Sequence, residues 1–435
     1  MAGLEPAGTL YTISPHALWA AKPEEESDVP SRPNRNDIVP LAGAVWDREE
    51  IDAVTSLLER HGRLRMGRRT NEFEARVAAL LGKRHGVMLN SGSSALDVGV
   101  ELLELPAGAE VITPPLTFST TVASIVHAGL VPSFVDAERE TFLVDIDRIE
   151  DMIGEQTRAM VIPNLIGNVP DWDRLRSIAD THDLLLLEDS CDTLGATLRG
   201  TPPGTRADIS CTSFNESHIV TCAGAGGLVA VDDDRLEMEA RLIRNWGRSS
   251  SRYGAGPQDF EGDLFEAEVG GTRYHRDFVF ERLGHNFESP EILAAFGLAQ
   301  LDKLAGFSLA RRERFAEHDA FFKGHAEHFL LPRQTVDVET TWMQYPLVVR
   351  DEAPFDREAL HRFLEENGVI ARPIWTGNIL RHPGFDKLDC RTTPEGYPVS
   401  DEVLRGGLLV AAHHGLTTGQ RDRIHEVFED FLARY

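Results

Sequence analysis

Short polar segments follow several apolar runs, and their residue types suit the binding of a phosphate group and a heterocyclic ring. Ser93 and Ser94 stand in Asn-Ser-Gly-Ser-Ser-Ala (90–95), where small residues and a helix start let backbone N–H groups approach an anion. A plain serine cap of that helix explains the same residues equally well. Asp189 follows the apolar run 184–187, where a carboxylate is costly unless it is paired, for example with a protonated ring nitrogen.

Three further residues fit the same chemistry. Phe118 in segment 114–120 offers a ring for stacking, and Ser213 offers a hydroxyl for a phosphate. His218 lies five residues after Ser213, ahead of the glycine-rich stretch 223–227, and a histidine suits a general base at neutral pH. Taken alone, each of these residues also fits an ordinary core, surface or strand-end position, and only their order and spacing together indicate one site.

The segments around these residues alternate between short apolar runs and stretches with helical periodicity. This alternation predicts an α/β fold with a mainly parallel sheet covered by helices. Ligands bind beyond the carboxyl ends of the strands in such sheets, which is where the polar residues stand. The expected strands span 87–89, 110–113, 131–135, 159–163 and 184–188, and the expected helices span 47–61, 70–81, 94–105 and 171–182.

A second region begins near residue 288. We expect a long helix from 292 to 325, strands at 343–349 and 368–373, and helices at 356–366 and 418–432. Residues 249–276 are glycine-rich and irregular, which predicts a long loop. The resulting domain prediction is an N-terminal tail (1–38), a large domain (39–287) and a smaller C-terminal α/β domain (288–435).

The overall composition excludes several functions. A net charge of −26 argues against a nucleic-acid partner. No apolar run approaches 18 residues, and the N-terminal tail lacks a signal-peptide pattern, so we expect no membrane association. The four cysteines form no close-spaced pair, so we expect neither a disulfide framework nor a metal site, and a reducing, cytoplasmic location.

Taken together, the segments from about residue 37 to the C-terminus resemble the DegT/StrS family of vitamin B6-dependent sugar aminotransferases and dehydratases. The resemblance rests on segment 90–95, on Leu-Leu-Glu-Asp-Ser-Cys-Asp-Thr-Leu-Gly (186–195), on Thr-Ser-Phe-Asn-Glu-Ser-His (212–218) and on Gly-His-Asn-Phe (284–287). It implies a fold type I aminotransferase-like fold, with a seven-stranded, mainly parallel sheet in the large domain and a smaller C-terminal domain.

The resemblance also implies which residues hold the cofactor phosphate. Ser93, Ser94 and Ser213 would bind it from within the chain. Asn286 would cross to the phosphate of a partner subunit, so the family likeness implies a homodimer with shared active sites.

Around the cofactor ring, the same resemblance places Phe118 over the ring, Asp189 at the pyridine nitrogen and Asp192 near the ring hydroxyl. His218 takes the position of the family's Schiff-base lysine, and the chain has no lysine between residues 84 and 302. The likeness is therefore to the 3-dehydrase branch, with pyridoxamine or pyridoxal phosphate held non-covalently and His218 as the catalytic base.

Four residues resemble positions near the sugar nucleotide in the family. They are Arg248, Arg372, Trp375 and Asn378. For Arg248, and for Arg244 in the same stretch (244–248), a surface salt bridge explains the arginine as well. A diphosphate is the alternative partner, because guanidinium groups bind it with paired hydrogen bonds.

Two features depart from the relatives. Iron–sulfur members of the branch carry three further cysteines after the Arg-x-Trp-Gly-Arg stretch (244–248), where this chain has Ser249, Ser250 and Ser251. One cysteine cannot hold a [2Fe–2S] cluster, so we expect none. The family's Gly-Glu-Gly-Gly turn is replaced by Ala-Gly-Ala-Gly-Gly (223–227).

The resemblance to the 3-dehydrase branch, with these departures, implies a lyase of deoxysugar biosynthesis. It would be a pyridoxamine phosphate-dependent dehydratase acting at C3 of a nucleotide-activated 4-keto-6-deoxy sugar, with an amino donor such as glutamate restoring the cofactor. Two alternatives stay open. One is an aminotransferase or another elimination with the same cofactor, and the other is a non-catalytic homologue that binds a partner enzyme.

Overall fold

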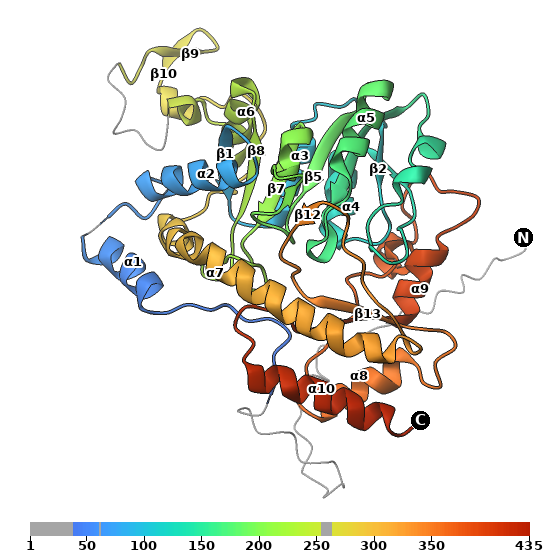
Figure 1. Cartoon of the computed structure of the whole chain (residues 1–435). Coiled ribbons are helices and arrows are strands. Elements are labelled where there is room, and N and C mark those ends of the chain that lie inside the picture. Colours follow the sequence, from blue (N-terminus) through green and yellow to red (C-terminus); the bar gives the residue numbers. More distant parts are fainter. Residues whose placement is uncertain (1–37, 61, 254–262) are drawn as a thin grey trace, which may run out of the picture.

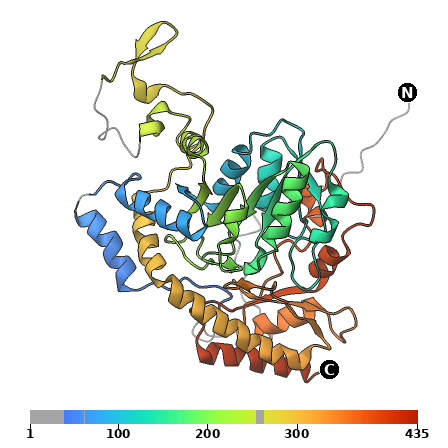
Figure 2. The ribbon, with the colours of Figure 1, turned by 45° about the horizontal axis from the view of Figure 1, so that its top comes forward.

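The computed structural model of the chain describes residues 38–60, 62–253 and 263–435. Figure 1 shows a large α/β body that carries a smaller C-terminal layer, with the long helix α7 (Glu291–Phe322) running along both. The second view shows the same two parts with α7 between them (Figure 2). Except for residue 38, the predicted N-terminal tail lies outside the described residues.

The large part contains a seven-stranded sheet in the order β1-β8-β7-β5-β4-β2-β3. Only β8 is antiparallel to its neighbours, and the other pairings are parallel, which confirms the prediction of a mainly parallel sheet. The strands are β1 (His85–Leu89), β2 (Glu110–Thr113), β3 (Val131–Phe134), β4 (Thr157–Pro163), β5 (Leu185–Asp189), β7 (Ile209–Ser213) and β8 (Gly227–Val231).

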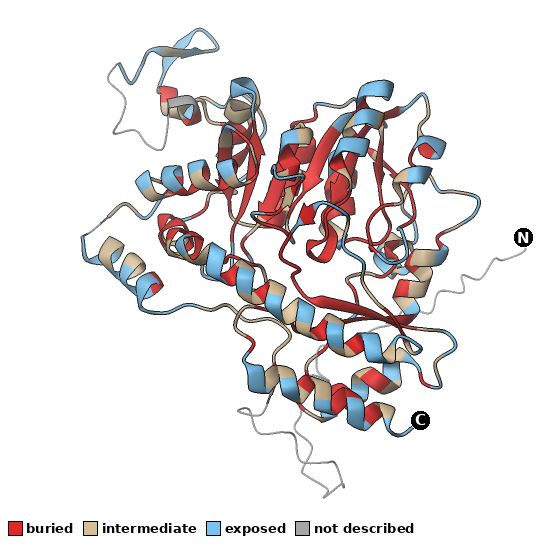
Figure 3. Cartoon of the chain, in the orientation of Figure 1, coloured by how far each residue is buried: buried red, intermediate tan, exposed pale blue. Residues whose placement is uncertain are grey.

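Helices cover both faces of this sheet because nearly every strand position is apolar, so alternate side chains point to opposite layers. In β1, for example, Val87 and Leu89 pack with α3, α4 and α6, whereas Met88 packs with α2 and α7. Figure 3 shows the strands buried between helices whose outer faces are exposed. The covering helices are α2 (Arg68–Leu80), α3 (Gly92–Glu101), α4 (Ser119–His127), α5 (Trp172–His182), α6 (Asp234–Arg244) and the first turns of α7, whereas α1 (Arg48–Glu59) packs on α7.

The helix starts follow local capping chemistry. Asp47 caps α1 in a capping box with Glu50, and Asp171 caps α5 by accepting hydrogen bonds from two backbone N–H groups. Thr417 forms a second capping box with Gln420 at the start of α10. These short-range signals explain why the predicted helix boundaries lie close to the observed ones.

The C-terminal part packs helices on a small antiparallel sheet. Its core is aromatic, with Phe322 of α7 packed among Tyr345 and Phe428. The elements are β11 (Phe329–Leu330), β13 (Tyr345–Val349), β14 (Gly407–Val410), α8 (Arg357–Glu366), α9 (Pro398–Gly406) and α10 (Thr418–Leu432).

The strand predicted at 368–373 was wrong. Val369 makes a single bridge with Val39, and Arg372 makes another with Leu409, so no continuous ladder forms. Pro373 cannot donate a hydrogen bond to a ladder, which limits pairing at that end. The third strand of the small sheet is β14 instead.

The irregular loop predicted at 249–276 contains a short hairpin in its described part, and residues 254–262 lie outside the described residues. Strand β9 (Ala267–Val269) pairs with β10 (Thr272–Tyr274) across Gly270 and Gly271, which both have positive φ. Two adjacent glycines suit such a tight turn because they adopt this backbone conformation without steric cost. A further two-stranded pair joins β6 (Thr197–Leu198) to β12 (Val338–Glu339).

Within the described residues, one helical stretch, Glu291–His325, is long and apolar enough to cross a membrane by length and composition. Half (50%) of its most apolar window is buried inside the protein. The helix packs Leu298 with Phe73 and Leu228 at one end, and Phe322 in the C-terminal core at the other. This burial is typical of a core helix.

Candidate active site

A cavity of about 360 Å³ opens at the carboxyl ends of β5 and β7 and at the start of α3. The sheet topology explains its position, since polar residues that follow parallel strands meet at one edge. Seven of the residues predicted from the sequence line it: Ser93, Phe118, Asp189, Asp192, Ser213, His218 and Trp375.

One end of the cavity is built to receive an anion. Ser91 caps α3 by accepting a hydrogen bond from the Ser94 N–H, and Ser93 lies in the first turn with its side chain at the cavity. Gly92 brings this turn against Ser213, because a Cβ on Gly92 would lie only 2.5 Å from the Cβ of Ser213. The helix N-terminus and serine hydroxyls therefore converge as a cradle for a phosphate group.

Ser94 points away from this cradle. Its hydroxyl donates a hydrogen bond of 2.7 Å to Oδ1 of Asn90, and the residue is buried. Ser94 therefore braces the turn, while Ser93 faces the cavity.

The carboxylate of Asp189 lies on the wall of the cavity. It accepts hydrogen bonds from Oγ1 of Thr121 (2.8 Å) and from the N–H of Cys191 (3.2 Å). Burial raises the pKa of Asp189, so a positively charged partner is needed to hold it as an anion. A protonated pyridine nitrogen has the required charge and shape.

Asp192 joins the cavity to the C-terminal part of the chain. Its Oδ2 accepts hydrogen bonds from the N–H of Ile166 (2.8 Å) and from Nε1 of Trp375 (3.2 Å). Burial raises the pKa of Asp192 to about 7. Ile166 and Trp375 both have positive φ (59° and 41°), which is rare for such bulky residues and is typical of functional sites.

His218 lies on the cavity wall with its ring orientation fixed. Nδ1 donates to the backbone carbonyl of Cys191, which leaves Nε2 as the acceptor nitrogen, and no described residue binds Nε2. Burial lowers the pKa of His218 to about 4, so the imidazole is neutral at neutral pH. None of the four described lysines (Lys83, Lys303, Lys323 and Lys387) lines the cavity.

Two aromatic side chains also line the cavity. The rings of Phe118 and Trp375 meet edge to face, with centroids 5.9 Å apart. Phe118 is half exposed and can cover a flat ligand that enters between it and the sheet. A phosphate cradle, a buried carboxylate and an aromatic cover thus surround one space, which fits a phosphorylated pyridine cofactor.

Residues 45–429 match the DegT/DnrJ/EryC1/StrS aminotransferase family. The chain belongs to this family. The resemblance predicted from the sequence motifs is therefore confirmed, and so is the fold type I, aminotransferase-like α/β fold.

Two relatives and one solved structure show the range of activities among similar proteins. A dTDP-4-dehydro-2,6-dideoxy-D-glucose 3-dehydratase of Saccharopolyspora spinosa is 32% identical over 90% of this chain and 86% of the relative. A GDP-perosamine synthase of Caulobacter vibrioides is 25% identical over 91% of this chain and 98% of the relative. The structure of E. coli GDP-4-keto-6-deoxy-D-mannose-3-dehydratase with bound hydrated PLP is 27% identical, with a TM-score of 0.81 over 90% of this chain and 99% of that one.

Asn286 and three predicted substrate residues lie outside the cavity. Asn286 is exposed, and Arg248 stacks its guanidinium on the ring of Trp246 at 4.7 Å. Arg372 pairs with a glutamate on the surface, and the buried Asn378 donates to Asp401. Their predicted roles in binding a partner's phosphate or a sugar nucleotide stay predictions.

Arg244 was considered above as a surface salt bridge or as a ligand of a diphosphate, and its burial excludes both roles. Its guanidinium is buried, pairs with Glu74 at 2.7 Å and donates to the carbonyl of Met88. It is neither a surface salt bridge nor a free diphosphate ligand, and it holds α6 against β1 and α2.

Sequence reasoning missed two residues that support the family site. Thr121 orients Asp189, and only the helical turn after Phe118 places it there. Arg311 on α7 donates to the carbonyl of His218 from 93 positions away in the chain. No local sequence pattern predicts either contact.

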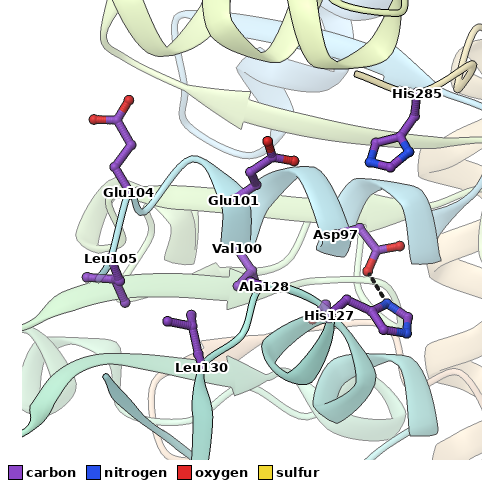
Figure 4. A pocket seen from close by; sticks show the side chains of 10 residues that line it. Asp97, Val100, Glu101, Glu104, Leu105, His127, Ala128, Leu130 and His285 are labelled. Atoms are coloured by element: carbon purple, nitrogen blue, oxygen red, sulfur yellow. Dashed lines mark hydrogen bonds and ion pairs between the residues drawn. The ribbon is translucent and has the colours of Figure 1, made fainter. Parts of the chain in front are cut away.

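A second hollow, of about 470 Å³, lies between α3 and α4 (Figure 4). It is bordered by the carboxylates of Asp97, Glu101 and Glu104 together with His127 and His285. Several of these groups are already paired, since Asp97 bonds His127 and the glutamates pair with arginines. No group of residues within the described ranges has the arrangement of a metal site.

Proposed function

We propose that this protein is a pyridoxamine phosphate-dependent dehydratase that acts at C3 of a nucleotide-activated 4-keto-6-deoxy sugar. The observation that carries the proposal is the fixed imidazole of His218 on the cavity wall, together with the absence of any described lysine from that wall. A lysine would anchor the cofactor covalently, whereas a neutral histidine supplies only a base.

The chain's own groups suit the cofactor's two charged ends. Ser93, Ser213 and the N-terminus of α3 would hold the phosphate, and Asp189 would hold the protonated ring nitrogen. When bound, the cofactor supplies an amine for the sugar ketone and a ring that withdraws electrons. Phe118 would exclude water from the outer face of the ring.

His218 would move the protons. Its Nδ1–H is held by the carbonyl of Cys191, so Nε2 presents a lone pair toward the cavity. The lowered pKa keeps this nitrogen unprotonated at neutral pH, ready to accept a proton. Having accepted it, the imidazolium would be the acid that protonates the departing C3 hydroxyl, and such acid–base catalysis is worth about 10² to 10⁴ in rate.

The cysteine positions support a reaction without an iron–sulfur cluster. Of the four cysteines, Cys191 lies at the cavity, while Cys211 and Cys222 are buried and burial raises the pKa of both thiols. A [2Fe–2S] cluster needs four ligands that converge. The unsaturated product would therefore hydrolyse to a 3-deoxy-4-keto sugar, and an amino donor such as glutamate would restore the amine.

The surface near Asn286 supports a homodimer with shared sites. The segment 263–283 projects from the body (Figure 1) and exposes a run of large apolar side chains. Exposed apolar patches of this kind mark protein interfaces. The exposed residues are Leu264, Phe265, Val269, Tyr274, Phe278, Phe280 and Leu283. We expect a cytoplasmic dimer, and light scattering during size-exclusion chromatography measures its mass.

The decisive experiment compares His218→Asn with His182→Asn, an exposed histidine at the end of α5 and outside the cavity. Purified protein is given pyridoxamine phosphate and a panel of nucleotide-linked 4-keto-6-deoxy sugars, and loss of the C3 hydroxyl is followed by mass spectrometry. We expect His218→Asn to retain the cofactor spectrum but lose turnover, while His182→Asn keeps both. Turnover that survives in His218→Asn would contradict the proposed base.

A second measurement tests the non-covalent cofactor. Protein loaded with pyridoxal phosphate is treated with borohydride, and its intact mass is measured. We expect no covalent adduct; a stoichiometric adduct would show that a lysine serves as anchor.

A sugar aminotransferase is the second candidate, favoured by the similarity to a GDP-perosamine synthase. The two reactions differ in their products. An aminotransferase gives an amino sugar that keeps its C3 hydroxyl, whereas the dehydratase gives a 3-deoxy ketone and ammonia. The same mass measurement distinguishes the two products. If the protein turned over none of the substrates, the hypothesis of a non-catalytic homologue that binds a partner enzyme would be favoured instead.

A further inference from the structure

A buried guanidinium lies directly behind the cavity wall that carries His218. It belongs to Arg311, which α7 places between the large sheet and the C-terminal part, and the residue is 0% exposed. Among the described residues no carboxylate pairs with it. A buried cation without a counter-ion is costly, and an apolar residue would fill the space without that cost.

The three partners of Arg311 are all neutral acceptors. Nη2 donates to the backbone carbonyl of His218 (3.2 Å), and Nη1 donates to the carbonyl of Met343 (2.6 Å). Nε donates to Nδ1 of His414 (3.1 Å), whose ring stacks on a phenylalanine of α7. The planar fork thus ties the His218 loop to two segments of the C-terminal part.

These contacts close a ring of hydrogen bonds around the cavity wall. The N–H of Met343 donates to the carbonyl of Ile166, whose own N–H donates to Asp192. The carbonyl of the preceding residue, Cys191, accepts from Nδ1 of His218. The guanidinium of Arg311 completes the ring of hydrogen bonds because it donates to the carbonyls of both His218 and Met343.

We propose that Arg311 is a positioning residue for His218: its guanidinium fixes the loop that carries the imidazole and sets a positive charge behind the ring. The inference rests on the proposed function only where it calls His218 a base. The fixed loop keeps Nε2 directed at the cavity. The charge disfavours a second proton on the imidazole, so the ring is neutral in the resting enzyme and free to accept a proton.

The charges around His218 support this assignment. Burial is the larger cause of the lowered pKa of His218, and the positive charge of Arg311 lowers it further. Burial also lowers the pKa of Arg311 to about 9, which still leaves the group charged at neutral pH.

The other titratable groups near the pair carry less fixed charge. Asp189, Asp192 and Cys191 line the same cavity, and burial raises the pKa of all three toward their neutral forms. On the far side of the guanidinium, burial and Arg311 lower the pKa of His413 to about 4 and that of His414 to about 3. Glu216, on the His218 loop, is exposed to solvent.

The test uses Arg311→Gln, which removes the charge but keeps an amide donor, and Arg311→Lys, which keeps the charge but loses the planar fork. The pKa of His218 is read from the carbon–proton NMR signal of its ring, identified by its loss in His218→Asn. Circular dichroism and the cofactor spectrum confirm folding. This readout needs no substrate, so it stands whether or not dehydration is observed.

We expect the pKa of His218 to rise by about one unit in Arg311→Gln and to stay near the wild-type value in Arg311→Lys. If dehydration is confirmed, the acid limb of kcat/KM should move upward with it, and Arg311→Lys should lose about tenfold in kcat through the looser loop. An unchanged pKa in Arg311→Gln, or the same shift in both variants, would overturn the proposal. Should Arg311→Gln fail to fold, wild-type kcat in Arg311→Lys would overturn the positioning role.

Discussion

Gly92→Ala tests whether the start of α3 and Ser213 form one phosphate cradle. The added Cβ would lie 2.5 Å from Cβ of Ser213 and 2.8 Å from its Oγ. Carbon atoms normally approach to about 3.5–4.0 Å, so the two segments must separate by about 1 Å. Overpacking of this kind costs about 1–3 kcal/mol, and the better helix propensity of alanine returns up to about 1 kcal/mol.

The net expectation is a loss of about 1 kcal/mol in unfolding free energy and a weaker phosphate site. Moving the helix start by this distance lengthens the contacts of a bound phosphate, and the loss of one such hydrogen bond weakens binding by about tenfold. Urea unfolding measures the first quantity, and absorbance titration with pyridoxal phosphate measures the second.

The matched control is Gly306→Ala in α7, where an added Cβ meets no atom within 4 Å. It should stabilise the fold by about 0.5–1 kcal/mol and leave cofactor affinity unchanged. If Gly92→Ala bound the cofactor with wild-type affinity and unfolded at the wild-type urea midpoint, the close packing of α3 on Ser213 would not be a cradle.

Three other predictions concern buried charges. Arg244→Met should lower the unfolding free energy by about 2 kcal/mol, because the buried Glu74 loses its 2.7 Å ion pair and keeps only the 3.1 Å pair with Arg241; a wild-type urea midpoint would contradict this. The pKa of Asp192 is raised from 3.8 to about 7 in the folded chain. Between these two pH values the folded chain keeps a proton on this carboxyl that the unfolded chain has lost. The free energy of unfolding therefore falls as the pH rises from about 4 to about 7. Asp192→Asn should therefore lose less Tm than the wild type between about pH 5 and pH 8, and equal losses would argue against a raised pKa. Burial lowers the pKa of His318 to about 3, so its ring should give the NMR signal of a neutral imidazole at about pH 5, and a protonated ring there would refute this.

The sequence predicted elements best where local signals agreed. Strand β2 and helix α10 match their predicted bounds, since one is a short apolar run and the other opens with a capping box. The 368–373 segment has a similar apolar character, yet its bridging partners are Val39 and Leu409. Pairing between distant segments produces no periodic pattern in the sequence, so these bridges could not be predicted.

For the site, spacing identified the residues but not the directions of all side chains. Ser93 and Ser94 are neighbours, and the helix phase turns the first toward the cavity and the second toward Asn90. Arg311 looks like one more charge in an Arg-Arg pair of a long helix, and only folding brings it to His218. Asn286 is predicted to contact a second subunit, so its role can be assigned only in the assembled dimer.

The continuity of α7 has a consequence for how the chain unfolds. Its first turns supply Ala294, Leu298 and Leu301 to the core that covers Phe73, and its last turn supplies Phe322 to the C-terminal core. A chain ended at residue 287 would leave the large sheet with an uncovered apolar face and would aggregate. Backbone amides at both ends of the helix should therefore exchange with deuterium at one common rate, as a single cooperative unit.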